Sequence, residues 1–262
     1  MQQRSNAYII GFAAVVCLVC SIVVSSTAVS LRPRQVQNKE LDRQKQVLIV
    51  AGLMQADQPV EAVEVQRLFD ESIVARAVEL STGSYDESVD VASYDQRKAT
   101  KDPALSKAAD PNSAGIRRLP NTAVIYQKVV DGETEMLILP IEGAGLWSTL
   151  YGFIALGKDA TTIEGITFYE HGETPGLGGE VDNPSWKALW TGRQAFDDGG
   201  EIAIEVIKGN AGPPADDPYR VDGIAGATIT ARAVSHLVRY WLADDGYGPY
   251  LDRFRADEGG VG

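Results

Sequence analysis

An uncharged apolar run at the N-terminus, AYIIGFAAVVCLVCSIVVSSTAVSL from Ala7 to Leu31, constrains the fold of this chain most. A run of about 25 residues is long enough to cross a membrane as a helix, which needs ~20. A cleaved signal peptide is the alternative, since SSTAVS could serve as a cleavage site, but its apolar core is only ~7–15 residues long. The length of the run favours a retained anchor. We therefore predict a single-pass membrane protein whose transmembrane anchor covers residues 1–33.

The charges on either side of this run bear on its orientation. Arg4 precedes the run, and several basic residues follow it, namely Arg32, Arg34, Lys39, Arg43 and Lys45. The positive-inside rule would place the large domain in the cytoplasm. Long translocated domains obey this rule weakly, so the charges alone leave the orientation open.

Composition excludes several classes of function. The formal net charge of −12 should repel nucleic acid, so we expect no nucleic-acid partner. Both cysteines, Cys17 and Cys20, lie inside the apolar run, and the only histidines are His171 and His236. The sequence therefore predicts neither a disulfide framework nor a metal site.

The part of the chain that follows the anchor has helical patterns. Pro33 interrupts the exit from the membrane, and a mixture of apolar and charged residues predicts a helix over residues 35–53. Apolar residues at helical spacing predict another helix from Glu61 to Leu80. A polar, turn-rich stretch from Ser81 to Gly115 predicts a long irregular connection with at most short ordered pieces. We therefore assign residues 34–120 to membrane-proximal helices and a connection.

Strand patterns dominate from Asn121 onward. TAVIYQKVV and ETEMLILPI flank Asp131-Gly132, a pair that favours tight hairpin turns. We predict a second pair over 147–157 and 162–170, a fifth strand over 201–209, a short helix over 184–190 capped by Asn183, and a closing helix over 226–243. Central strands with flanking helices predict an α+β domain over residues 121–262 with a largely antiparallel sheet.

Two glycine-rich stretches in this domain could approach a ligand closely. In EGAGLWSTLYGF, residues 142–153, Trp147 and Ser148 follow two glycines, which predicts either a plain turn with a buried tryptophan or a ligand site with an aromatic wall. In YEHGETPGLGGEV, residues 169–181, a solvated turn is the alternative to a binding loop. His171 and Glu173 could form an acid–base pair, but no nucleophile accompanies them. Backbone amides beside Leu177 suit a planar heteroaromatic ligand better.

A third stretch, VDGIAGATITARAV from Val221 to Val234, enters the closing helix. Thr228 falls in its first turn, where unpaired backbone N–H groups and the positive end of the helix dipole stabilise a phosphate. Gly223 and Gly226 would let the main chain come close to such a group. An ordinary capped helix is the alternative, because Gly-x-x-Gly alone is a weak signal and the Walker pattern is absent.

Together the three stretches resemble the C subunit of the bacterial Na⁺-translocating NADH:quinone oxidoreductases and, more distantly, the G subunit of the Rnf electron-transport complexes. The resemblance covers nearly the whole chain, and GLWS favours the first family. The family's terminal motif reads Asp-Gly-x-Ser/Thr-Gly-Ala-Thr. Its last threonine carries FMN through a phosphoester bond, which a dedicated flavin transferase installs from FAD.

Carried onto this chain, the resemblance implies covalent FMN on Thr228, with Thr230 at most a neighbour. Ala225 departs from the usual hydroxyl residue, which would slow loading if that hydroxyl aids recognition by the transferase. The remaining candidate cofactor-binding residues are Asp222, Gly223, Gly226, Ala227, Trp147, Ser148, Glu173, Thr174, Leu177, Gly178 and Lys208, the last as a phosphate neighbour.

The resemblance also implies an electron-carrier subunit in a multi-subunit oxidoreductase of the bacterial inner membrane, with the FMN domain in the periplasm. The chain lacks a dinucleotide fingerprint, so we expect it not to react with NADH alone. We expect flavin chemistry rather than catalytic acid–base residues. A G-type Rnf subunit and a non-redox module that binds another phosphate ligand are the alternatives.

Overall fold

The computed structural model describes residues 5–55 and 59–259. The chain divides into two compact units, Met1–Arg43 and Gln44–Gly262. α1, Asn6–Val50, is the one helix among the described residues that is long and apolar enough to cross a membrane. The apolar side chains of its first four turns are exposed, as a membrane-spanning segment requires.

The predicted break between the anchor and a separate helix over 35–53 is wrong, because α1 continues through Pro33 to Val50. A proline removes one backbone hydrogen bond and crowds the preceding turn. In a helix of 45 residues that loss leaves the hydrogen-bonded turns on both sides intact. The last turn lies in the second unit, where Val47 and Leu48 are fully buried.

The predicted helix from Glu61 to Leu80 is only half right. α2, Ala62–Ser72, ends where β1, Ile73–Glu79, begins. β1 pairs antiparallel with β5 over its whole length, from Ile73 opposite Lys128 to Glu79 opposite Thr122. The segment IVARAVE begins with two β-branched residues, which favour strands, and its long-range partner overrides the helical spacing.

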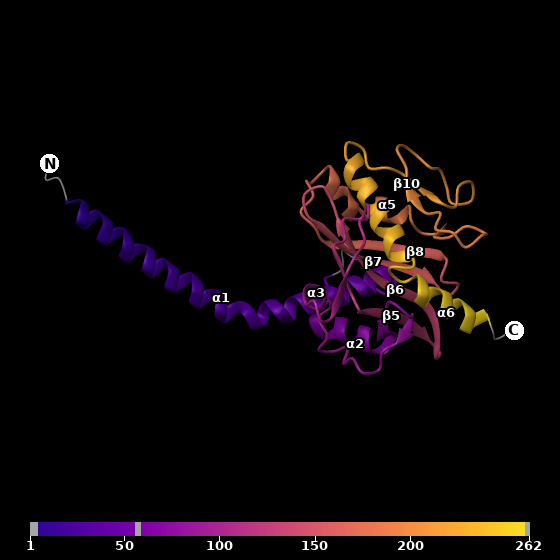
Figure 1. The fold of residues 1–262 in the computed structure, drawn as a ribbon, viewed down its shortest axis with the longest axis horizontal. Helices are drawn as coiled ribbons and strands as arrows, with labels where there is room; N and C mark the ends of the chain where they lie inside the picture. Colours follow the sequence, from indigo (N-terminus) through magenta and orange to yellow (C-terminus); the bar gives the residue numbers. More distant parts are fainter. Residues whose placement is uncertain (1–4, 56–58, 260–262) are drawn as a thin grey trace. The chain divides into compact units, whose positions relative to one another are not determined.

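A seven-stranded antiparallel sheet lies at the centre of the second unit, in the order β2-β1-β5-β6-β7-β8-β9. Its long central strands are β5, Thr122–Val130; β6, Glu133–Ala144; β7, Thr149–Gly157; and β8, Thr162–Glu170. Figure 1 labels β5, β6, β7 and β8. Both predicted strand pairs are confirmed. Asp131 and Gly132 both have positive φ, as the predicted tight hairpin requires.

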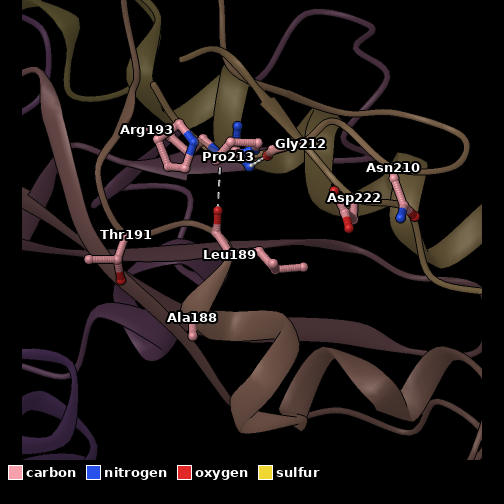
Figure 2. Close-up of a pocket in the computed structure, with 9 residues that line it drawn as sticks. Ala188, Leu189, Thr191, Arg193, Asn210, Gly212, Pro213 and Asp222 are labelled. Atoms are coloured by element: carbon pink, nitrogen blue, oxygen red, sulfur yellow. Dashed lines mark hydrogen bonds between the residues drawn. The ribbon is translucent and has the colours of Figure 1, made fainter. Parts of the chain in front are cut away.

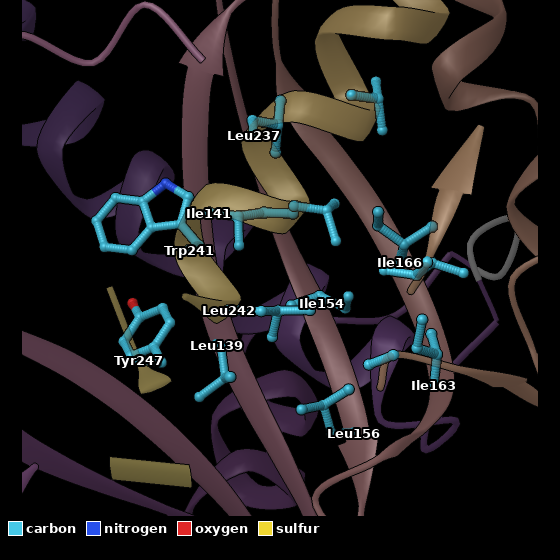
Figure 3. Close-up of a cluster of buried hydrophobic side chains, with 14 of the residues drawn as sticks. Leu139, Ile141, Ile154, Leu156, Ile163, Ile166, Leu237, Trp241, Leu242 and Tyr247 are labelled. Carbon is cyan, nitrogen blue, oxygen red and sulfur yellow. The ribbon is translucent and has the colours of Figure 1, made fainter. Parts of the chain in front are cut away.

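One face of the sheet packs against α5, Thr228–Leu242, and the segment that follows it (Figure 3). Leu237, Trp241 and Tyr247 pack there with Ile141 and Ile154. Trp241 Nε1 donates to the Glu142 carbonyl at 2.7 Å. This bond fixes α5 against the end of β6, where the first glycine-rich stretch begins.

Short elements complete the unit. They are β2, Ser84–Tyr85; α3, Gln96–Lys101; β3, Ser106–Ala108; β4, Arg118–Pro120; η1, Gly178–Asp182; α4, Pro184–Ala188; β9, Arg193–Gln194; and α6, Gly248–Gly259. Short ordered pieces within the predicted irregular connection are thus confirmed. The cap at Asn183 is also confirmed, since its side chain accepts from the Ser185 N–H. α6 has no counterpart among the predicted helices.

The predicted fifth strand over 201–209 is wrong in extent. Ile202 forms one isolated antiparallel bridge with Phe196, and only Glu205–Val206 forms a strand, β10, which runs parallel to β11, Arg220–Val221, outside the main sheet. Alternating residues thus predicted a strand correctly but could not show its partner. β11 leads directly into Asp222 and so delivers the third glycine-rich stretch to α5.

Candidate functional site

The first turn of α5 is open to a ligand. The helix begins at Thr228, and the preceding Ala227 has no side chain that could cap it (φ −130°, ψ 45°). Helix starts usually carry Ser, Thr, Asp or Asn, whose oxygen accepts from the N–H of the second or third residue. Gly226 before it has φ +73°. An anion can therefore take the position that a capping side chain usually holds.

Two threonines in this turn have opposite surroundings. Thr228 is exposed, whereas Thr230 is 1% exposed. The Thr230 hydroxyl donates to Glu173 Oε2 at 2.6 Å. A hydroxyl that is buried and already bonded cannot serve as the acceptor of a modifying group, so Thr228 is the hydroxyl of the pair that is accessible to react.

The Glu173 carboxylate joins the three glycine-rich stretches. Its Oε1 accepts the backbone N–H of Trp147 at 2.9 Å, while Oε2 holds Thr230. The side chain is 5% exposed. The packing around it requires glycine at Gly178, because a Cβ there would lie 2.5 Å from Thr230 Oγ1 and 2.6 Å from Glu173 Oε2. Both oxygens face protein donors, which makes Glu173 a brace beneath the site.

The first two loops meet through a further bond, from a backbone N–H of the second loop to a side chain of the first. Ser148 Oγ accepts the Gly172 N–H at 2.6 Å, and the Gly145 N–H donates to the Ser148 carbonyl at 2.8 Å. Trp147 is 71% exposed, so the alternative of a turn built around a buried tryptophan is wrong. The turn instead presents the indole at the surface, beside the point where all three stretches are tied.

The second loop also approaches the third. Thr174 is exposed, and its carbonyl accepts the N–H groups of Leu177 and Gly179, which closes the turn. Leu177 is 45% exposed, and a Cβ on Gly226 would lie 3.1 Å from its Cδ2. Leu177 and Trp147 thus supply apolar surface to the same group of loops that presents Thr228.

His171 and Glu173 do not form an acid–base pair. His171 Nδ1 accepts the Glu173 backbone N–H at 3.2 Å, and Nε2 contacts Asp182 Oδ2 at 2.7 Å. The Glu173 carboxylate faces away from the imidazole, toward Trp147 and Thr230. The histidine therefore shapes the loop, and the described residues offer no cluster of His, Cys, Asp and Glu that could hold a metal ion.

The third stretch is fixed by its own polar contacts. Asp222 Oδ1 accepts the Ala211 N–H at 2.8 Å, and the Asp222 carbonyl accepts Trp186 Nε1 at 2.9 Å. The Gly223 N–H donates to the Gly209 carbonyl at 2.9 Å. Lys208 is exposed next to Gly209, at the start of the loop. Asp222 and Gly223 are therefore structural supports for the segment that carries Thr228.

Sequence reasoning missed a cavity of about 680 Å³ beside the Trp147 turn. It is lined on one side by Gly145, Trp147 and Ser148 and on the other by basic residues, namely Lys101, Arg117 and Arg118. Glu142 also lines it, and burial raises the pKa of its carboxyl although Arg97 and Lys101 act in the opposite direction. Lys101 comes from the stretch predicted to be irregular, Arg117 and Arg118 follow it closely, and no pattern marked any of the three.

The three joined loops lie within residues 145–243, which match the family model described as an FMN-binding domain. The chain is therefore one that carries an FMN-binding domain. The C subunit of the Na(+)-translocating NADH-quinone reductase of Pseudomonas aeruginosa is 46% identical over 259 residues, which cover 98% of both chains. The corresponding protein of Yersinia pestis is 44% identical over 92% of this chain and 90% of the relative. The chain therefore belongs to the family of C subunits of the Na(+)-translocating NADH-quinone reductases.

Solved structures agree with this assignment. The crystal structure of NqrC from Shewanella oneidensis matches with a TM-score of 0.76 and 33% identity, over 84% of this chain and 99% of that one. The crystal structure of the C subunit from Parabacteroides distasonis matches with a TM-score of 0.63 and 30% identity, over 84% and 96%. The α+β fold with a largely antiparallel sheet and flanking helices is thus confirmed.

Proposed function

We propose that this chain is an electron-carrying subunit of a membrane-bound, Na⁺-translocating NADH-quinone reductase and that FMN is joined to Thr228 Oγ1 by a phosphoester bond. The membership of the family and the match to an FMN-binding domain support the subunit and the cofactor. The observation that carries the covalent link is the contrast between an exposed Thr228 and a buried, bonded Thr230 at an uncapped helix start.

The charges near Thr228 suit the proposed linkage. A phosphodiester on the Thr228 hydroxyl keeps one negative charge, which the unpaired N–H groups of the first turn and the helix dipole stabilise. Lys208 is an exposed cation on the adjoining loop. Because Ala227 offers no competing oxygen, these amides are available to the phosphate.

The remaining candidate residues divide into two roles. Trp147 and Leu177 are exposed and apolar and would cover a planar ring system, with Ser148 and Thr174 nearby. Glu173, Gly178 and Asp222 would act from beneath by holding the loops. FMN supplies one- and two-electron redox chemistry when bound, and the protein's part is to position and shield it.

The proposal extends to maturation and assembly. A flavin transferase would load Thr228 from FAD: the hydroxyl oxygen of Thr228 would form a bond to the phosphorus of the FMN half, the pyrophosphate bond of FAD would break, and AMP and the hydroxyl proton would be released. Other subunits would exchange electrons with this one, and the loaded domain would lie on the periplasmic side of the inner membrane. α1 meets the length and composition that an anchor needs. Ala225 is exposed beside the acceptor, at a position where a transferase could reach it.

Mass spectrometry of the full chain, expressed with a flavin transferase, tests the attachment. We expect the peptide that contains Thr228 to gain the mass of one FMN less one water. Thr228→Ser keeps a hydroxyl and should still be loaded, whereas Thr228→Val should be colourless after denaturation. Flavin that is released by denaturing the wild-type chain, or a modification mapped elsewhere, would contradict the proposal, and a chain that stays colourless would favour the non-redox alternative.

A further inference from the structure

Arg193 is a buried arginine whose bonds all go to backbone carbonyls. It lies on β9 and is 1% exposed. Its Nε donates to the Leu189 carbonyl at 3.0 Å and its Nη2 to the Gly212 carbonyl at 2.5 Å (Figure 2). Its Nη1 donates to the Asp217 carbonyl. The guanidinium thus holds two points of one loop, residues 209–217, against the end of α4.

No carboxylate in residues 5–55 and 59–259 forms an ion pair with Arg193. A buried charge is costly unless it is paired, and arginine is almost never fully buried otherwise. The planar guanidinium presents several N–H donors in a fixed arrangement, which suits several carbonyls at once. A lysine at this position keeps the charge but cannot reproduce that arrangement.

The loop that Arg193 holds has little apolar packing of its own. None of residues 209–217 is buried, and Gly209 and Gly212 have φ of +94° and +84°. A cavity of about 270 Å³ remains between this loop, Arg193 and Asp222 (Figure 2). Polar contacts rather than burial therefore determine the conformation of the loop.

The opposite side of the loop is tied to the stretch that carries Thr228. The Ala211 N–H donates to Asp222 Oδ1, and the Gly209 carbonyl accepts the Gly223 N–H. Thr228 follows Gly223 closely in the sequence, and Lys208 immediately precedes the loop. A displacement of the loop would thus move Lys208 together with Asp222 and Gly223, which support the segment that carries Thr228.

We propose that Arg193 is a positioning residue for flavin attachment, acting through the loop 209–217 and Asp222 to fix the direction in which Thr228 is presented. This inference rests on the proposed attachment of FMN to Thr228. Arg193 does not touch the acceptor in this arrangement; it holds the carbonyls of Gly212 and Asp217, and the loop holds Asp222 and Gly223 in turn.

The test is the rate of flavin transfer from FAD to the purified, flavin-free full chain in detergent, with limiting transferase. Arg193→Lys should lower kcat for the acceptor chain roughly tenfold to hundredfold, because small misplacements of a reacting group have effects of that size. Arg220→Lys is the matched control, since the side chain of Arg220 is 53% exposed and its Nε pairs with Asp217 of the same loop. Lysine keeps the charge at this exposed end of the pair, so the variant should load within about twofold of the wild type.

Two further variants separate positioning from stability. Ala211→Pro removes the N–H that Asp222 accepts and leaves Arg193 intact, so it should also slow loading, at a temperature where circular dichroism shows both variants folded. Combining Ala211→Pro with Arg193→Lys should slow loading less than the product of the single effects, because both act through one loop. A double variant that is slowed by the full product of the two single effects would contradict the idea that both residues act through the loop 209–217.

The outcomes distinguish this inference from the proposed function. If the wild-type chain is not modified at Thr228, the proposed attachment fails. If the wild type is modified and Arg193→Lys or Ala211→Pro loads at the wild-type kcat, the positioning role fails while the attachment stands. If Arg193→Lys does not fold, the kcat of Ala211→Pro decides alone.

Discussion

The two threonines at the start of α5 should respond in opposite ways to the same substitution. Thr230→Val replaces a hydroxyl with a methyl group of similar size in a site that is 1% exposed. It removes the 2.6 Å bond to Glu173 and leaves Oε2 of a buried carboxylate without that donor. Thr228→Val makes the same chemical change at an exposed position.

The expected size of the effect follows from this geometry. A hydrogen bond to a charged group contributes ~1.5–3 kcal/mol, and an unsatisfied buried partner adds to the loss, so Thr230→Val should cost about 2–3 kcal/mol of unfolding free energy. For a domain of this size, 1 kcal/mol shifts Tm by ~2–4 °C, which gives a drop of roughly 4–12 °C. Thr228→Val should stay within ~0.5 kcal/mol of the wild type.

Thermal unfolding by circular dichroism should be measured on the full chain in detergent, produced without a transferase. A covalently attached flavin would otherwise add contacts that exist only in the folded chain and so change its stability. Flavin attachment is then scored by mass spectrometry and in-gel fluorescence after expression with the transferase. We expect Thr230→Val to be less stable and still loaded, and Thr228→Val to be as stable as the wild type and unloaded.

Two results would refute the reasoning. A Tm of Thr230→Val within 1 °C of the wild type (about the smallest shift that ~0.5 kcal/mol produces) would show that the carboxylate brace contributes nothing. A folded Thr230→Val chain that carries no flavin, with Thr228→Val fully loaded, would reverse the roles of the two residues.

Further predictions concern the loops and the cavity. Gly178→Ala should cost about 1–3 kcal/mol and reduce loading, since its Cβ would meet Thr230 and Glu173, which already hold each other at 2.6 Å; an unchanged Tm would contradict this packing. Trp147→Ala should leave the flavin-free Tm within ~1–2 °C, because the indole is 71% exposed, yet change the absorption and fluorescence of the loaded protein; identical spectra would remove the indole from the proposed site. Burial raises the pKa of the Glu142 carboxyl above its usual 4.5, so this carboxyl holds its proton more tightly in the folded chain than in the unfolded chain. The protonated carboxyl therefore favours the folded state, and this contribution to stability is lost as pH rises through the folded pKa. Glu142→Gln should therefore raise Tm relative to the wild type at pH 8 and leave it unchanged near pH 4, and an equal difference at both pH values would rule out titration as the cause.

Much of the fold follows from local patterns, because the relevant interactions are close in sequence. The Asp131-Gly132 hairpin needs two residues with positive φ, and that pair supplies them. Apolar strand patterns predicted the central strands, and Asn183 marked the start of α4. By contrast, Ile73–Glu79 joins the sheet through β5, some fifty residues further along, and helical spacing gave no sign of that partner.

The candidate site divides in the same way. Glycines, an indole and two threonines were visible as three stretches that suit a phosphorylated aromatic ligand. Their connection was not visible, because the bond between Thr230 and Glu173 spans 57 positions. Arg193 carried no signal at all, since a single arginine beside a glycine gives no hint that its donors will hold a distant loop.

The sequence by itself determined that Thr228 and Thr230 face different ways, because residues two apart on a helix are turned by about 200° from each other. It also determined the anchor-length apolar run and the permissive glycines before the helix. Only the tertiary structure decided which threonine faces inward. The packing of α5 on the sheet directs Thr230 toward the buried Glu173 carboxylate, and this long-range bond leaves Thr228 as the exposed hydroxyl at the helix start.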